Sequence, residues 1–179
     1  MKEYKILFTG PMGAGKTTAI GSVSDHPPVL TDVRNHDSSH GKALTTVGLD
    51  FGEFALGSGE RIRLFGTPGQ SRFDFMWKIL ARNALGLIIL IDNTSADPLA
   101  DLRLYLEGFL QGADRLACAI GVGRLQAEGG LTVDDYADEL ARLGHVLPVL
   151  DVDVRRRSDV VLLIDTLLAQ LEVDSLEMS

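Results

Sequence analysis

The run GPMGAGKTT at residues 10–18 constrains the fold of this chain more than any other feature of its sequence. It matches the pattern GxxxxGK[ST], and it lies between a short apolar run at residues 4–9 and a helical segment at residues 15–24. Glycines let the backbone turn its N–H groups toward an anion, and the free N–H groups at a helix start add partial positive charge. The run therefore predicts a strand–loop–helix unit that binds nucleotide phosphates.

Side-chain chemistry assigns roles within this phosphate loop. We expect Lys16 to bridge the β- and γ-phosphates, Thr17 to offer its hydroxyl to Mg²⁺, and Thr18 to bond the α-phosphate. The alternatives are an incidental glycine-rich turn, which the flanking strand and helix disfavour, and a plain helix-start role for Thr18. The predicted nucleotide contacts in this loop are Gly10, Met12, Gly13, Ala14, Gly15, Lys16, Thr17 and Thr18.

Strand and helix patterns alternate along the rest of the chain. Further strands are predicted at residues 47–56, 61–65, 85–91, 116–122 and 146–150, and further helices at residues 72–84, 99–110, 132–143 and 159–171. The polar segment at residues 24–46 is predicted to be a long mobile loop. Together these elements predict one α/β domain, residues 1–179, with a mostly parallel six-stranded sheet, one antiparallel edge strand and helices on both faces.

Charge and composition exclude several classes of function. A formal charge of −8 argues against nucleic-acid binding, because contact with a phosphate backbone needs clusters of Lys and Arg. No apolar stretch approaches the roughly 20 residues that cross a bilayer, so direct membrane insertion is not expected. Cys118, the single cysteine, lies in an apolar run and is predicted to be a buried reduced thiol, which fits a cytoplasmic location.

Two further segments carry a resemblance to a known family. GTPGQ at residues 66–70 resembles the DxxGQ segment of small Ras-like GTPases, and TVGLDF at residues 46–51 resembles their TIGxDF stretch. Together with LFGTPGQSRFDFMW, they make the chain similar to the bacterial small GTPases related to MglA, which are encoded beside roadblock-domain proteins. The resemblance implies a three-layer Ras-like P-loop NTPase fold and a regulatory switch that binds GTP or GDP with Mg²⁺ and hydrolyses GTP slowly. It also implies a protein effector and a roadblock-domain regulator as partners.

The same resemblance implies roles for three residues outside the phosphate loop. Thr46 would coordinate Mg²⁺ and touch the γ-phosphate, Gly69 would donate its backbone N–H to that phosphate, and Gln70 would orient the attacking water. The implied catalytic residues are therefore Gln70, Lys16 and Thr46, and the implied metal ligands are Thr17 and Thr46. The alternatives are a strand-forming role for Thr46 and a solvated loop position for Gln70.

The chain departs from the family pattern at the metal. Gly66 stands where most small GTPases carry an aspartate that holds Mg²⁺ through water, and glycine has no side chain for this. Asp50, on the neighbouring predicted strand, either faces the same site or is an exposed carboxylate of an edge strand.

A second departure concerns the base. The guanine-reading pattern NKxD is replaced by residues 123–126, GRLQ, so the carboxylate that accepts two hydrogen bonds from guanine is missing. Arg124 either stacks on the base or is a solvated loop residue. The later SAK element is reduced to residues 153–155, DVR, where Val154 retains a backbone N–H for the nucleotide.

Met12 limits how an activator protein could stimulate hydrolysis, and two functions other than a GTPase switch remain open. Its bulk would obstruct an arginine finger from a partner, so an internal arginine, Arg34 or Arg72, is the hypothesis for stimulated hydrolysis. One alternative function is a module that holds nucleotide without hydrolysing it. The other is an ATP-dependent small-molecule kinase, although the arginines are scattered and GTPGQ would then have no role.

Overall fold

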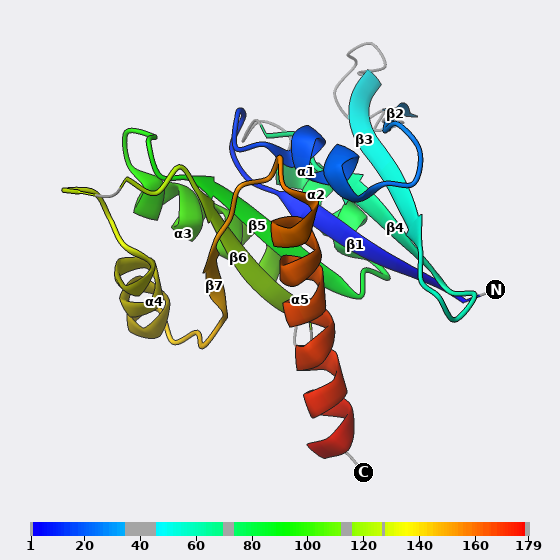
Figure 1. The fold of residues 1–179 in the computed structure, drawn as a ribbon. Coiled ribbons are helices and arrows are strands. Elements are labelled where there is room, and N and C mark those ends of the chain that lie inside the picture. The colour runs from blue at the N-terminus through cyan, green and yellow to red at the C-terminus, as the bar shows by residue number, and fades with distance from the viewer. Residues whose placement is uncertain (1, 35–45, 70–73, 112–115, 127, 178–179) are drawn as a thin grey trace.

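The structure is a computed structural model that describes residues 2–34, 46–69, 74–111, 116–126 and 128–177, with only the backbone at residues 31–34, 46–48 and 174–177. The described residues form one central sheet with helices on both faces (Figure 1), which confirms the predicted α/β class. The strands are β1 Glu3–Thr9, β2 Val29–Arg34, β3 Thr46–Ala55, β4 Arg61–Gly66, β5 Gly86–Asp92, β6 Ala117–Gly123 and β7 Val149–Asp151. The helices are α1 Lys16–Val23, α2 Asp74–Ala81, α3 Pro98–Leu110, α4 Val133–Arg142 and α5 Arg157–Glu177.

Sheet order explains where the chain crosses over. The strands are arranged β2-β3-β4-β1-β5-β6-β7, with β1 parallel to both β4 and β5, and with β5, β6 and β7 parallel in turn. Only β3 runs against its neighbours among the described strands, because it pairs antiparallel with both β2 and β4. The helices between the parallel strands provide the long connections that such pairing requires.

Strand β2 corrects the predicted strand count from six to seven. It lies inside the segment predicted as a loop, and it pairs with β3 over its whole length, from Val29 opposite Phe51 to Arg34 opposite Thr46. Val29 and Leu30 remain exposed, so β2 gains its order mainly from pairing rather than from burial of apolar side chains. As a result β2, and not β3, is the edge strand.

Alternation along β1 divides the core into two layers. Ile6 and Phe8 pack with residues of α1 and α5 on one face, whereas Leu7 packs with residues of α2 and α3 on the other. Figure 1 shows α1 and α5 on the near side of the sheet and α2 and α3 on the far side. Cys118 belongs to the second layer, where burial raises the pKa of its thiol to about 12, so the predicted buried thiol is confirmed.

Helix ends show how well local sequence rules apply. The predicted N-cap Thr132 is confirmed, since its hydroxyl accepts from the Asp135 N–H while the Asp135 carboxylate accepts from the Thr132 N–H. Helix α5 extends six residues beyond its predicted end, and its last turns project past the sheet (Figure 1). Among the described residues, no helix has the length and apolar character that a membrane span needs.

Candidate nucleotide-binding site

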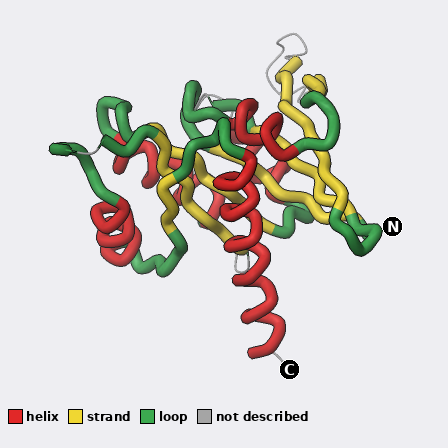
Figure 2. The backbone as a smooth tube through the Cα atoms, viewed as in Figure 1, coloured by secondary structure: helices red, strands yellow, loops and turns green. Residues whose placement is uncertain are grey.

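A cavity of about 710 Å³ opens where the parallel strands end. The loops after β1, β6 and β7 gather at the carboxyl edge of the sheet (Figure 2), as expected for a ligand site in an open parallel sheet. Its lining comes from the phosphate loop, from the segment after β6 and from the segment between β7 and α5. The cavity residues are Gly13, Ala14, Gly15, Lys16, Thr17, Thr18, Asp92, Gly123, Arg124, Leu125, Asp151, Val152, Asp153, Val154, Arg155, Arg156 and Asp159.

The phosphate loop has a conformation that only glycine adopts easily. Gly10, Gly13 and Gly15 have φ angles of 142°, 80° and 96°. Gly15 is the N-cap of α1 and no side chain caps the helix start, whose first turn contains no acidic residue. The N–H groups at this end of α1 are therefore available to an anion.

Lys16 lies inside this loop with its ammonium turned back on the backbone. Its Nζ donates to the carbonyl oxygens of Gly10 and Pro11, each at 2.8 Å. Burial lowers the pKa of Lys16 to about 8, against the opposing effect of the nearby Asp50 carboxylate. The arrangement holds one positive charge where phosphate oxygens would enter.

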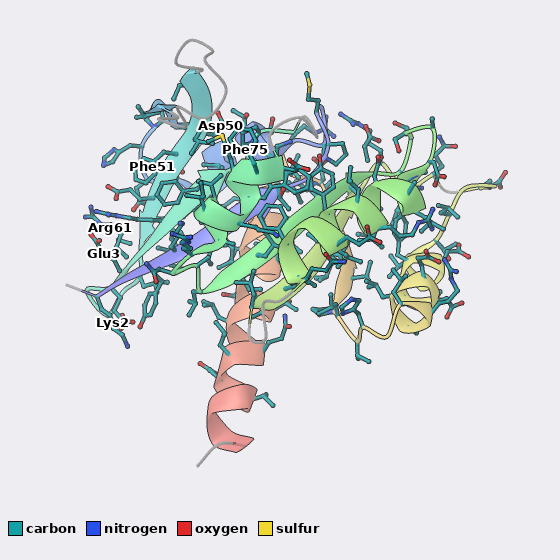
Figure 3. All side chains as sticks on the ribbon, turned by 180° about the vertical axis from the view of Figure 1, so that it is seen from behind. Lys2, Glu3, Asp50, Phe51, Arg61 and Phe75 are labelled. Atoms are coloured by element: carbon teal, nitrogen blue, oxygen red, sulfur yellow. The ribbon has the colours of Figure 1, made fainter. Side chains whose placement is uncertain are left out.

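Thr17 and Asp50 come together beside this charge. The Thr17 hydroxyl donates to Asp50 Oδ2, and the Asp50 side chain lies over Gly66, where a Cβ would be 3.1 Å from the Asp50 Cβ. Figure 3 shows Asp50 at the opposite end of the sheet from Lys2, Glu3 and Arg61. Of the two interpretations of Asp50, the exposed edge-strand carboxylate is wrong. The residue is half-buried on an inner strand and lies in the space that a residue larger than Gly66 would occupy.

An ion pair lies in the part of the cavity that is lined by the loop after β6, where a nucleotide base is expected. Arg124, at φ 57°, pairs with the carboxylate of Asp92 and also donates to the Gly13 carbonyl oxygen at 3.3 Å. Burial would raise the pKa of Asp92, but hydrogen bonds from Thr94 and the charge of Arg124 outweigh it and lower the pKa. Arg124 therefore connects the loop after β6 to the phosphate loop, and its predicted stacking on a base stays a prediction.

Val154 contacts the phosphate loop directly. A Cβ at Gly15 would lie 2.7 Å from Val154 Cγ2, so the segment after β7 packs closely on the start of α1. The neighbouring Asp153 carboxylate accepts two bonds from Arg155, whose hydrogen bonds and charge hold the pKa of Asp153 far below its usual value. Val154 and Arg124 thus line the same cavity as Lys16, and their predicted contacts with a nucleotide stay predictions.

Gly69 lies directly against the phosphate loop. A Cβ at this position would be 2.7 Å from Met12 N and 2.9 Å from Lys16 Nζ. The Met12 side chain is 67% exposed. Thr46 opens β3 with only its backbone described, and Gln70 and Arg72 lie outside the described residues, as does the side chain of Arg34. The predicted roles of these four residues stay predictions.

Several cavity residues were not singled out from the sequence. Asp92 ends the buried strand β5, and the carboxyl end of a central parallel strand is a recognised position for functional side chains. Asp151, Arg156 and Asp159 join the cavity through the path of the chain after β7, for which no local motif gives a signal.

Comparison with known proteins finds distant relatives of this chain. The pig Ras-related protein Rab-27A is 25% identical over 182 aligned positions, which cover 92% of this chain and 76% of that protein. The dog Rab-27A is 28% identical over 64% of this chain and 55% of its own length, and the Gallus gallus Rab-8A is 26% identical over 62% and 49%. The chain thus spans about half the length of the latter two relatives. No family model matches the chain. The fold and the phosphate loop agree with this distant similarity to the Ras and Rab small GTPases.

Proposed function

We propose that this protein is a regulatory switch that binds GTP and GDP with Mg²⁺ and hydrolyses GTP slowly. The observation that carries the proposal is the assembly of Lys16, Thr17 and Asp50 at the uncapped start of α1, with Gly69 held against the same loop. A γ-phosphate entering beside Lys16 would meet the Gly69 backbone, so its presence or loss would be felt in the segment leading to α2.

The side chains at this point suit Mg²⁺. A threonine hydroxyl and a carboxylate in contact are hard oxygen donors of the kind that this ion prefers. Thr17 would hold the ion directly, Asp50 would replace the aspartate missing at Gly66, and Thr46 would complete the set in the GTP-bound form. The bound ion would supply charge neutralisation for the phosphate oxygens.

Hydrolysis by this chain needs positioning more than covalent chemistry. Lys16 would neutralise charge on the β- and γ-phosphates, the Gly69 N–H would hold the γ-phosphate, and Gln70 would orient the attacking water. Thr18 and the backbone of residues 10–15 would bind the remaining phosphate oxygens. Without an arginine from a partner the rate would be slow, and Met12, which is 67% exposed, would obstruct the approach of such an arginine.

Guanine selection would rest on an unusual set of groups. Gln126 is exposed and is not part of the cavity lining, so the base would meet Arg124, Leu125 and the backbone at Val154. The resemblance to MglA-related bacterial GTPases adds a protein effector and a roadblock-domain regulator to the proposal, and the single buried thiol of Cys118 adds a cytoplasmic location.

A single-turnover experiment tests this function. Purified protein loaded with GTP and Mg²⁺ is followed for conversion to GDP, in the unaltered chain and in Gln70→Ala. Slow conversion that falls at least tenfold in Gln70→Ala supports the switch, since orientation of water is its proposed role. No conversion above the protein-free background in either protein would support a non-hydrolysing module, and faster phosphate transfer from ATP to a metabolite than to water would support the kinase.

A further inference from the structure

Tyr105 in α3 forms a hydrogen bond with the backbone of Gly69. Its hydroxyl donates to the Gly69 carbonyl oxygen at 3.0 Å, across 36 residues of sequence. The side chain is almost fully buried, and burial raises the pKa of Tyr105 to about 12, so the phenol remains a donor at every physiological pH. Gly69 therefore lies against the phosphate loop and also accepts a hydrogen bond from this hydroxyl.

The position of the Tyr105 ring is fixed by aromatic packing between α2 and α3. Trp77 in α2 lies against Tyr105, with ring centroids 4.8 Å apart, and stacks on Phe109 at 5.1 Å. Gly108 makes room for this indole, because a Cβ there would lie 2.4 Å from Trp77 Cε3. Such interlocked rings leave the hydroxyl little freedom, so its bond to Gly69 is directed rather than incidental.

The bonded carbonyl belongs to the peptide that joins Gly69 to Gln70. The preceding peptide carries the Gly69 N–H, which the proposed function assigns to the γ-phosphate. Holding one peptide of a glycine restricts the orientation of the other, and glycine otherwise has wide backbone freedom. A glycine held in place loses less entropy when the γ-phosphate arrives.

We propose that Tyr105 is a positioning residue that holds Gly69 beside the phosphate loop and so favours the triphosphate over the diphosphate. This inference rests on the proposed nucleotide switch. The Tyr105 hydroxyl contributes to binding only when a γ-phosphate engages Gly69, whereas a diphosphate makes no use of it. The ring itself serves the packing of α2 on α3 and is retained in Tyr105→Phe.

Tyr136 offers a matched control. It is fully buried, and its hydroxyl donates to Asn93 Oδ1 at 2.6 Å, away from Gly69. Tyr136→Phe therefore removes a phenol oxygen and a comparable hydrogen bond without changing the bond to Gly69.

The test measures dissociation constants of GDP and of a non-hydrolysable GTP analogue with Mg²⁺ in the three proteins. In Tyr105→Phe, analogue affinity should fall by up to about fivefold while GDP affinity stays unchanged; the value of one neutral hydrogen bond is the upper limit, because this bond is already made without nucleotide. Tyr136→Phe should leave the ratio of the two affinities as it is in the unaltered chain.

Three other results would overturn the inference. Unchanged affinities in Tyr105→Phe, equal losses for both nucleotides, or the same change of ratio in Tyr136→Phe would each show that the hydroxyl does not position Gly69 for a γ-phosphate. An unaltered chain that binds neither nucleotide would refute the proposed switch itself, and that outcome is distinct from binding that is indifferent to Tyr105.

Discussion

The pKa of Lys16 predicts that nucleotide affinity falls in mildly alkaline solution. Burial lowers this pKa to about 8, so about nine-tenths of the empty protein carries the charge at pH 7 and about one-tenth at pH 9. Phosphate oxygens bind the protonated ammonium. Above pH 8 most molecules must therefore take up a proton at Lys16 when the nucleotide binds, and this proton uptake weakens binding as the pH rises. Affinity for GDP should therefore fall about tenfold between pH 7 and pH 9.

Equilibrium titration with GDP at saturating Mg²⁺ and constant ionic strength measures this dependence. The terminal phosphate has its own second pKa near 6, so the range above pH 7 isolates the protein group. Lys16→Arg serves as the control, because a guanidinium does not titrate in this range; its affinity should be weaker at pH 7 but flat with pH. A flat profile in the unaltered chain, or the same slope in Lys16→Arg, would refute the reasoning.

The lowered pKa of Lys16 also determines how the free energy of unfolding of the nucleotide-free protein changes with pH. The folded-state pKa of Lys16 lies below the ordinary lysine value of 10.5, so the unfolded chain binds more protons between pH 8 and pH 10.5. The contribution of Lys16 to the free energy of unfolding should accordingly rise with pH across that window. Bound nucleotide, which keeps the ammonium charged, should remove this rise.

Substitutions at three places test other parts of the structure: beside the metal, in the phosphate loop and at the start of α4. Asp50→Asn should weaken Mg²⁺ affinity about tenfold in Mg²⁺-dependent nucleotide release, and adding Gly66→Asp to the unaltered chain should not strengthen it, because the new Cβ would lie 3.1 Å from that of Asp50. Gly10→Ala should lower the free energy of unfolding by about 3 kcal/mol, since φ is 142° and the new Cβ would lie 2.1 Å from a β5 carbonyl oxygen. Gly13→Ala, whose Cβ would have no atom within 4 Å, should lower it by only about 1 kcal/mol. Equal losses of the two variants in denaturant unfolding would contradict this reasoning. Thr132→Ala should remove the cap of α4 at about 1 kcal/mol and lower Tm by about 3 °C, with GDP affinity unchanged; an unchanged Tm would argue against the cap.

The sequence predicted elements whose signals are local. The glycine-rich loop, the buried strands β5 and β6 and the cap at Thr132 each depend on a pattern of a few residues, and all three lie where the patterns placed them. Strand β2 escaped prediction because its ladder is made with β3, more than ten residues later, and Val29 and Leu30 are exposed. A strand stabilised by pairing carries little periodic signal of its own.

Within the site, too, only the residues that belong to a local motif could be predicted from the sequence. Lys16 and Thr17 follow from a motif, but the contact of Asp50 with Thr17 over Gly66 depends on the register of β3 against β4, which no local pattern specifies. The hydrogen bond from Tyr105 to Gly69 depends on how α3 packs beside α2, and it becomes visible only in the folded chain.

Identification of the nucleotide that stays bound during purification tests the central claim most directly. Protein purified with Mg²⁺ is denatured, and the released nucleotide is separated by chromatography and quantified against protein. A guanine nucleotide, mainly GDP, in a substantial fraction of the molecules is the predicted result, because a slow GTPase accumulates its product. Adenine nucleotide in place of guanine, or no affinity for either GDP or GTP when these are added back, would contradict the account.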